Sequence, residues 1–461
     1  MRWAAGLAGA VALALPAFAQ EAAAVADAVT AAVEMAPAAA EAAADPVPNK
    51  GDTAWMMTAT VLVMLMIVPG LALFYGGLVR TKNMASVLTQ VISVASLAMI
   101  MWLMVGYGLA FGGDFNQFIS TGKFFMAGVT SDSTAATFTD GVVIPEFVFI
   151  AFQMTFSAIT LALVVGGLVE RMKFSALMVF GIVWLVLVYY PIAHMVWYAG
   201  ADEATTGLIF GWGALDFAGG TVVHINAGVS ALVGALILGK RIGYQKELMA
   251  PHSLTMTLVG TGLLWVGWFG FNAGSALEAD GIAGLALINT FAATAAGVLF
   301  WMLTERALGH QGSLLGACSG AIAGLVAITP AAGNSGPIGA ILLGAVAGIV
   351  ACWFVMKLKP KLGFDDSLDV FGIHGVAGII GSVGTAFTML TVLGGPAGDD
   401  YELGSQLWIQ VKSVIVAIAW AGIGSAIAFY IAKALTGLRV TPEVEREGLD
   451  LSEHGERAYN Y

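Results

Sequence analysis

The sequence predicts an all-α membrane protein that crosses the bilayer eleven times. Three observations lead to this prediction: an apolar composition, a regular alternation of apolar stretches with short polar joints, and a one-sided distribution of basic residues. Of the 461 residues, 59% are hydrophobic and only 11% are charged, and the mean hydropathy is +0.86. Soluble proteins carry about 25% charged residues, so this chain lacks the polar surface for several water-facing domains. The net charge of −11 argues against a nucleic-acid partner.

The amino-terminal segment has the pattern of a secretory signal. Arg2 precedes an apolar run that ends in Ala17-Phe18-Ala19, a small-residue cleavage site. This run is too short for a first membrane helix, which is the alternative interpretation. We therefore expect residues 1–19 to be a signal peptide and residues 20–53, rich in Ala, Glu, Asp and Pro, to be an exported flexible leader.

Residues 54–435 are expected to form the membrane domain. Most of its apolar stretches reach the roughly 20 residues that a helix needs to cross a bilayer core. The predicted spans are 54–79, 84–111, 145–169, 174–198, 219–239, 254–275, 281–303, 313–329, 336–356, 370–391 and 407–435.

The basic residues give an independent test of this count. All but Arg2, Lys50, Lys123 and Lys412 follow odd-numbered spans or lie at the carboxyl end. Cytoplasmic loops collect Lys and Arg, so the pattern predicts an amino end outside and a carboxyl end inside. This orientation requires an odd number of spans. We expect a multi-pass protein of the cytoplasmic (inner) membrane, with acidic residues in its outer joints.

Spans 5 and 10 begin with similar patterns. Asp216 lies eight residues before His224, with Gly228 four residues later, and Asp366 lies eight residues before His374, again with a glycine four residues later. The predicted topology runs span 5 inward and span 10 outward. Spans 1–5 and 6–10 are therefore predicted to form an inverted repeat, the architecture of many transporters, whose substrate site lies between the two halves.

Three histidines lie inside the predicted spans. An ionisable group at that depth is costly and is a candidate for function. For His224 and His374 a role in function is favoured over a structural one, because neutral imidazoles can donate and accept hydrogen bonds to a small neutral or weakly basic solute. His194, beside Pro191, is expected to bond backbone groups that the proline frees.

Aromatic side chains repeat at helical spacing near the span ends. Phe152 and Phe156 share one helix face, as do Phe271 and Ser275, and Trp197 ends span 4. Such faces could recruit a cation at the outer mouth. The alternative is an ordinary interfacial belt of aromatic residues.

Enzyme chemistry is poorly supported. The sequence has no HExxH, G-x-S-x-G or Walker motif, and its two cysteines have no metal-binding spacing. We expect no enzyme activity, no cofactor and no metal site.

Five motifs together resemble the Amt family of ammonium transporters, which is related to the Rhesus glycoproteins. The likeness runs from about residue 54 to the carboxyl end. The motifs are Pro-Gly-Leu-Ala-Leu-Phe-Tyr-Gly-Gly-Leu at 69–78, Asp-Phe-Ala-Gly-Gly-Thr-Val-Val-His-Ile-Asn at 216–226, Gly-Trp-Phe-Gly-Phe-Asn-Ala-Gly-Ser at 267–275, Gly-Ala-Cys-Ser-Gly-Ala-Ile-Ala-Gly at 316–324 and Asp-Val-Phe-Gly-Ile-His-Gly at 369–375.

The resemblance implies a homotrimer in the membrane lipid, with one narrow pore through each protomer. By the family's pattern, Trp197, Ser275 and Phe156 would recruit ammonium, and Phe156 and Phe271 would form a gate. The remaining implied roles are pore lining for His224, His374, Phe152, Tyr75 and Trp268, and an essential acidic group at Asp216. Residues 436–461 resemble the family's cytoplasmic regulatory tail, although by themselves they could be a solvated tail. A PII-type signal protein would dock on the cytoplasmic face, near Lys240 and Arg241.

Together these features predict transport of ammonium, with methylammonium as an analogue. The cation would lose a proton near the phenylalanine gate, and ammonia would pass the two histidines. An ammonium receptor without net transport is one alternative, although a receptor would usually carry an added signalling domain. A neutral-gas channel of Rhesus type is another, against which the cation-recruiting residues argue.

Overall fold

The computed structural model describes residues 46–460, and eleven helical spans lie within them. The spans are Lys50–Leu78, Thr81–Phe111, Glu146–Leu168, Phe174–Trp197, Gly220–Leu238, Leu254–Gly274, Gly281–Ala307, Leu314–Ala331, Pro337–Leu362, Phe371–Thr388 and Leu403–Thr436. The predicted helical fold with eleven spans is confirmed. The signal peptide and residues 20–45 of the leader lie outside the described residues.

The first span starts four residues earlier than the sequence predicted. Asn49 caps it, because its side-chain oxygen accepts hydrogen bonds from the backbone N–H groups of Gly51 at 2.7 Å and Asp52 at 3.2 Å. The ninth span runs to Leu362, beyond the predicted residue 356, because the helix continues through three lysines that resemble a polar joint in the sequence.

Several spans are built from consecutive helical pieces. Short π-helical turns interrupt them, a feature common at functional sites. In chain order the pieces of the spans are α2 (Lys50–Leu65), η1 (Met66–Leu71), α3 (Ala72–Leu78), η2 (Thr81–Asn83), α4 (Met84–Met101), η3 (Trp102–Gly106), α5 (Tyr107–Phe111), α6 (Glu146–Leu168), α7 (Phe174–Trp184), η5 (Leu185–Tyr189), α8 (Tyr190–Trp197), η6 (Gly220–Ile225), α10 (Asn226–Leu238), α11 (Leu254–Gly274), α12 (Gly281–Ala307), α13 (Leu314–Ile328), η7 (Thr329–Ala331), α14 (Pro337–Trp353), η8 (Phe354–Leu358), α15 (Lys359–Leu362), η9 (Phe371–Val376), α16 (Ala377–Thr388) and α17 (Leu403–Thr436).

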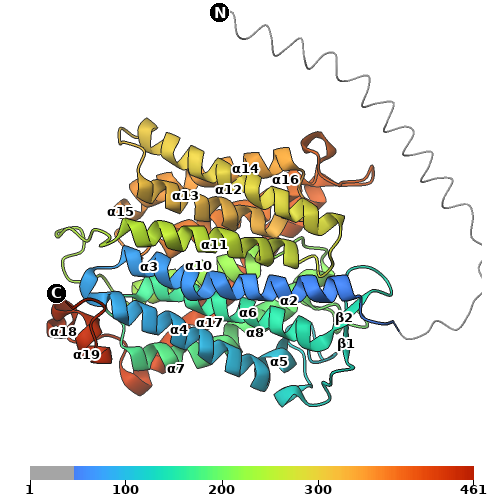
Figure 1. Ribbon diagram of the computed structural model, residues 1–461, viewed down its shortest axis with the longest axis horizontal. Helices are drawn as coiled ribbons and strands as arrows, with labels where there is room; N and C mark the ends of the chain where they lie inside the picture. The colour runs from blue at the N-terminus through green and yellow to red at the C-terminus, as the bar shows by residue number, and fades with distance from the viewer. Residues whose placement is uncertain (1–45, 461) are drawn as a thin grey trace, which may run out of the picture. The chain divides into compact units, whose positions relative to one another are not determined.

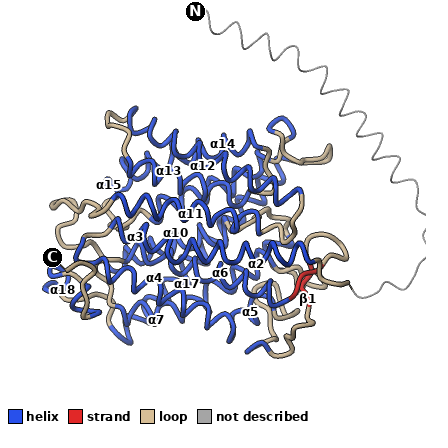
Figure 2. Tube along the Cα trace, viewed as in Figure 1, coloured by secondary structure: helices blue, strands red, loops and turns tan. Residues whose placement is uncertain are grey.

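The elements between the spans define two ends of the helix bundle. The hairpin end carries the antiparallel strands β1 (Thr134–Ala136) and β2 (Val143–Pro145), in which Ala135 pairs with Ile144, and the tail end carries the last two helices (Figures 1 and 2). The remaining short elements are η4 (Phe124–Met126), α9 (Leu208–Gly211), η10 (Thr391–Leu393), α18 (Pro442–Glu447) and α19 (Leu449–His454).

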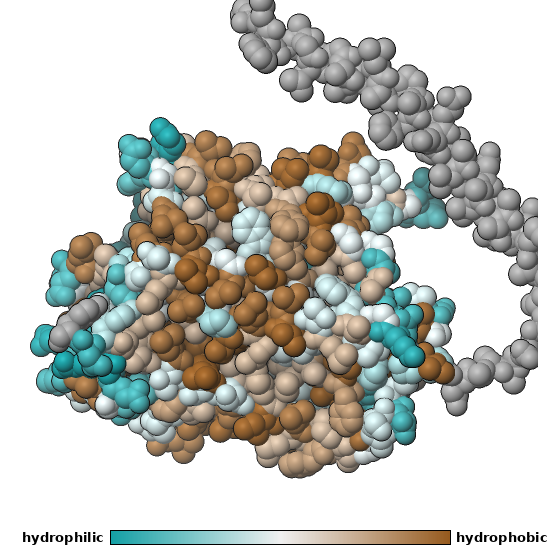
Figure 3. Space-filling view, in the orientation of Figure 1, coloured by the Kyte–Doolittle hydropathy of each residue, from teal (hydrophilic) through white to brown (hydrophobic). Residues whose placement is uncertain are grey.

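Hydrophobic side chains cover the middle of the bundle on the face shown in Figure 3, and hydrophilic ones gather at its two ends. This is the surface that a bilayer core with two polar interfaces requires. Glycines let the helices approach closely. A Cβ atom at Gly297 of α12 would lie 2.3 Å from the carbonyl oxygen of Gly320 on α13, so no side chain fits there.

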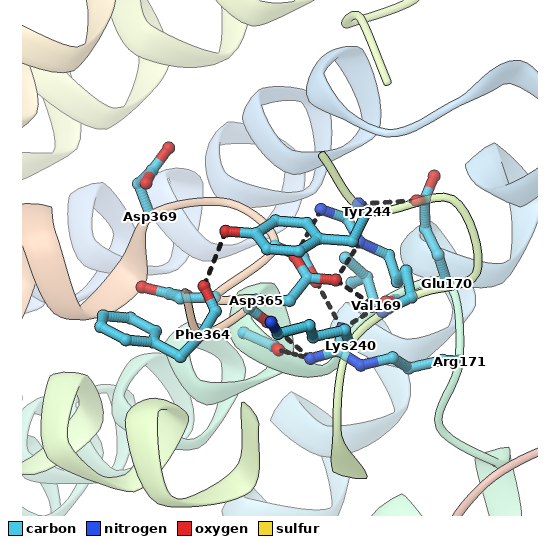
Figure 4. A network of polar contacts seen from close by, with 12 residues as sticks. Val169, Glu170, Arg171, Lys240, Tyr244, Phe364, Asp365 and Asp369 are labelled. Carbon is cyan, nitrogen blue, oxygen red and sulfur yellow. Dashed lines mark hydrogen bonds and ion pairs between the residues drawn. The ribbon is translucent and has the colours of Figure 1, made fainter. Parts of the chain in front are cut away.

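A buried ion-pair network ties the span ends together at the tail end (Figure 4). The Arg241 guanidinium lies 2.7 Å from Glu170 and 2.8 Å from Asp365, and Arg80 pairs with Glu170 at 3.0 Å. Burial raises the pKa of Glu170, but the guanidinium groups of Arg241 and Arg80 outweigh it and lower the pKa to about 2. Because Arg241 is buried and paired, it does not offer its charge to a docking protein as the sequence suggested, whereas Lys240 is exposed.

Replacing Arg241 by Met is expected to destabilise the protein by about 3–5 kcal/mol, because two buried carboxylates lose their partner. The temperature of half-unfolding in detergent checks this. Arg306→Met is the matched control, since Arg306 is exposed and makes no ion pair among residues 46–460. The stabilisation through Glu170 should be present above pH 4.5 and disappear as the pH falls towards 2. An equal unfolding temperature for wild type and Arg241→Met would contradict the assignment.

The carboxyl-terminal segment packs on the same chain rather than extending as a solvated tail. Asp450 accepts hydrogen bonds from the backbone N–H groups of Ala85 and Ser86 at the start of α4, at 3.1 and 2.8 Å. Glu453 accepts from Phe174 N–H at 2.8 Å. Anionic side chains are favourable at helix starts, so α19 joins the first turns of two spans.

Candidate functional site

A cavity of about 670 Å³ opens at the hairpin end. Five of the predicted site residues line it, from α6, the end of α8, the start of span 5 and the end of α11. They are Phe152, Phe156, Trp197, Asp216 and Ser275. The hairpin residues 134–139 also line it, so a segment without a recognised motif helps to shape the cavity.

The floor of this hairpin-end cavity is an aromatic stack. The rings of Phe156 and Phe271 lie with centroids 4.2 Å apart and planes inclined by 21°. Trp197 meets Phe156 edge-on at 5.8 Å, and its indole N–H donates to the backbone oxygen of Asp216 at 2.9 Å. Ser275 donates its hydroxyl hydrogen to Phe271 O at 2.8 Å, which leaves the hydroxyl oxygen as an acceptor. Both phenyl rings are buried, so the stack separates the cavity from the protein interior.

Beyond the stack lie the two histidines. Phe271 lies 5.9 Å from the His224 ring, and the His224 Nδ1 atom lies 3.2 Å from the Nδ1 atom of His374. Trp268 stacks on His224 at 5.3 Å. His224, His374 and Trp268, together with apolar side chains, line a small cavity of about 10 Å³, close to the least volume that holds one water molecule. The path here is narrow and has few polar groups.

Asp216 caps the helix that carries His224. Its carboxylate accepts from the N–H groups of Gly219 at 2.8 Å, Gly220 at 2.5 Å and Thr221 at 2.8 Å, and also from the Thr221 hydroxyl. Oriented N–H groups at a helix start favour a negative charge. The acidic residue thus positions η6, besides lining the cavity.

The second half of the chain repeats this arrangement. Asp366 accepts from Phe371 N–H at 2.7 Å, at the start of η9, which carries His374. Burial raises the pKa of Asp366 to about 6. The paired Asp and His residues thus occupy matching local structures, as the inverted repeat requires.

Two predicted residues lie elsewhere. Tyr75 is buried in α3 and donates to Leu163 O at 2.9 Å, and it does not line either of these two cavities. His194 contacts the backbone oxygens of Ala110 at 2.9 Å and Asn116 at 2.8 Å, which Pro191 does not free. The carbonyl that Pro191 frees is a different one: Leu187 O accepts instead from the indole N–H of Trp420 at 3.0 Å.

Sequence reasoning missed Gln153. It lines the hairpin-end cavity, and its buried Oε1 atom has no hydrogen-bond partner among the described residues. An amide among the apolar residues of span 3 was the signal that could have identified it. Across residues 46–460, no three His, Cys, Asp or Glu side chains gather as metal ligands.

Comparison with known proteins identifies the family. The profile of the Ammonium Transporter Family matches residues 54–459. The ammonium transporter of Aquifex aeolicus is 45% identical over 418 residues, 89% of this chain and 94% of that protein. The ammonium transporter of Bacillus subtilis is 43% identical, over 89% and 98% of the two chains.

Solved structures agree in fold. Mep2 of Saccharomyces cerevisiae matches with a TM-score of 0.74 and 34% identity, over 86% of this chain and 91% of that chain. A protein described as a sensor Amt protein matches with a TM-score of 0.79 and 28% identity, over 88% and 98%. The relatives are named as transporters rather than enzymes, and this chain belongs to the ammonium transporter family.

Proposed function

We propose that this chain moves ammonium across the cytoplasmic membrane as ammonia, with the proton removed at the aromatic stack. The observation that carries the proposal is the order of groups along one path: the hairpin-end cavity, the Phe156–Phe271 stack, and then the His224–His374 pair. The gathering of basic residues at the tail end supports an orientation with the hairpin end outside.

The cavity suits recruitment of a cation. The faces of Phe156 and Trp197 attract a cation by about 0.5–2 kcal/mol, more where water is excluded. Ser275 and Gln153 add oxygen acceptors for the ammonium N–H groups. The cavity is wide enough for the ion to arrive hydrated and to exchange water for these partners.

The path beyond the stack disfavours an ion. Moving a bare charge into apolar surroundings costs many kcal/mol unless its hydration is replaced. The small cavity leaves no room for a hydration shell and offers imidazole nitrogens as its polar groups. Ammonium therefore gives up a proton near the stack to water of the open hairpin-end cavity, and the neutral molecule continues. Ammonia takes up a proton again from water on the far side of the membrane.

The histidine pair sets which hydrogen bonds are available. One Nδ1 must carry the hydrogen and the other must accept it, because the two atoms lie 3.2 Å apart. In neutral rings the remaining Nε2 atoms are then one acceptor and one donor. Ammonia both donates and accepts, so the pair can pass it along without a charged partner.

Replacing His224 or His374 by Ala tests this path. We expect ammonium selectivity to fall in both variants, because water or ions can enter once an imidazole is removed. Methylammonium uptake and currents evoked by ammonium, potassium and sodium in proteoliposomes measure the change. Unchanged uptake together with unchanged ion selectivity in both variants would refute the histidine path.

A receptor without net transport is the second candidate, because the sensor Amt protein shares the fold. The same vesicle assay separates the two functions, since a receptor would bind ammonium without filling the vesicles. A neutral-gas channel would produce uptake that does not saturate with the cation concentration.

We also propose a homotrimer embedded in membrane lipid, with a PII-type protein docking on the tail end as regulator. The exposed Lys240 and the packed α18 and α19 helices provide a charged, ordered surface there. The mass of the purified complex tests the trimer, and a pulldown with and without residues 436–461 tests the partner.

A further inference from the structure

Lys123 extends into the hairpin-end cavity and pairs with a buried carboxylate. Its Nζ atom lies 2.5 Å from Oε1 of Glu146, and the Tyr107 hydroxyl donates to the same oxygen at 2.6 Å. Nζ also lies 6.0 Å from the centre of the Tyr107 ring. All three side chains line the cavity. The carboxylate, the hydroxyl oxygen and the aromatic face are the groups that bind a small ammonium ion elsewhere in proteins.

The backbone is built to bring the lysine to this point. Lys123 has a φ of +47°, Phe125 of +55° and Met126 of +61°, in the left-handed region that residues with side chains rarely adopt. The loop also packs closely on α5 and the residue after it. A Cβ atom at Gly108 or Gly112 would lie 2.4 Å from the carbonyl oxygen of Gly122. Strained backbone of this kind persists where the surroundings fix it, often at functional sites.

The other carboxylates lining the cavity already have internal hydrogen bonds. Asp216 caps η6, Asp280 accepts from Ala283 N–H at 2.8 Å, and Glu278 accepts from the Thr139 N–H and hydroxyl at 3.2 and 3.1 Å. Among the carboxylates that line the cavity, Glu146 is the one that forms an ion pair, with the Lys123 ammonium group. The lysine terminus is a primary alkylammonium, the same chemical group as methylammonium.

Glu146 begins α6 and lies nearer the hairpin end of this helix than Gln153 and Phe156. It precedes Gln153 by seven residues on α6, which corresponds to about 10 Å along the helix axis. It precedes Phe156 by ten residues, or about 15 Å. A cation held at Glu146 would therefore sit well short of the aromatic stack.

We propose that Glu146 and Tyr107 form a second cation site at the entrance of the cavity and that the Lys123 ammonium fills it. The proposal rests on the proposed function. With the lysine in place, arriving cations meet no free charge at Glu146 and are sorted at the aromatic stack. A free carboxylate would instead hold potassium or sodium as readily as ammonium, because it attracts small cations by charge. Lys123 therefore acts as a specificity residue.

Lys123→Met tests the proposal in proteoliposomes. We expect the KM for methylammonium uptake to fall by roughly 3- to 10-fold, the range of a partly exposed charge pair, and potassium to become an inhibitor. In a chain that already carries Glu146→Gln, adding Lys123→Met should change neither the KM for methylammonium nor the response to potassium. Lys412→Met is the matched control, because Lys412 is also at the hairpin end but lies over the Trp212 ring and does not line the cavity.

Calorimetric titration of the purified protein with methylammonium chloride gives a readout that needs no transport. The Lys123→Met variant should gain one binding site, and the double variant should not. Lys123→Gln serves as a second neutral variant should Lys123→Met fail to fold. The second site is wrong if the wild-type protein takes up methylammonium but Lys123→Met shows an unchanged KM, no potassium inhibition and no added binding site. That outcome leaves the proposed function intact. If the wild-type protein shows no methylammonium uptake, the proposed function is wrong. The titration would then still show whether Lys123→Met gains a cation site.

Discussion

Replacing Asp216 by Ala is expected to reduce methylammonium uptake to the level of vesicles without protein. The substitution removes the acceptor of three backbone N–H groups within 2.8 Å at the start of η6, the helix that carries His224. Each buried donor left without a partner costs about 1–3 kcal/mol, so the helix start must rearrange. The effect should be a loss of transport rather than a change in affinity, because the start of η6 moves and takes His224 out of its place in the path.

The control for Asp216→Ala is Asn49→Ala. Asn49 also caps a span by accepting from two N–H groups, but it lies in neither cavity. We expect its loss to cost about 0.5–2 kcal/mol of stability and to leave uptake intact. Uptake by Asp216→Ala at the wild-type rate, measured with equal amounts of folded protein in the vesicles, would show that the cap is dispensable.

Gly228→Ala is expected to lower uptake by about tenfold or more. Gly228 of α10 lies against η9, and a Cβ atom there would be 2.4 Å from Gly375 N and 2.5 Å from Gly375 Cα. Backbone atoms cannot move aside as a flexible side chain can, so the two helices must separate. Overpacking costs about 1–3 kcal/mol, and here it would also open the 3.2 Å contact between His224 and His374. Initial rates of methylammonium uptake measure the effect.

Gly262→Ala is the matched control, because a Cβ atom at Gly262 in α11 meets nothing within 4 Å. This variant should keep its uptake and become slightly more stable, since alanine favours a helix over glycine by about 1 kcal/mol. If Gly228→Ala transports as fast as Gly262→Ala, the close approach of the two histidine helices is not needed for conduction.

The sequence predicted the spans well because a bilayer makes span length and composition strong constraints. All eleven were identified, and most ends agreed within a few residues. Two of the larger differences have local causes: the Asn49 cap begins α2 four residues early, and the helix continues through Lys357, Lys359 and Lys361, which resemble a polar joint in the sequence. Hydropathy responds to apolar length, whereas caps and continuing turns depend on individual hydrogen bonds.

Site residues were harder to interpret than spans. The motif resemblance selected Phe156, Phe271, His224 and His374, and these residues do lie close together in the interior. It gave no information on Gln153, which stands among apolar residues with its amide oxygen unpaired. It also placed Arg241 at a docking face, although the side chain is buried between Glu170 and Asp365.

The sequence by itself determined the all-α class, the number of spans and the family, because each follows from periodicity, composition and motifs along the chain. Only the tertiary structure decided which side chains share a cavity. Lys123, Glu146 and Tyr107 are separated along the chain, and left-handed turns and close glycine contacts bring them together. Asp216 likewise appeared as an acidic group before a histidine, and folding shows its carboxylate holding the start of η6. Pairing of this kind depends on packing in three dimensions, which local sequence does not encode.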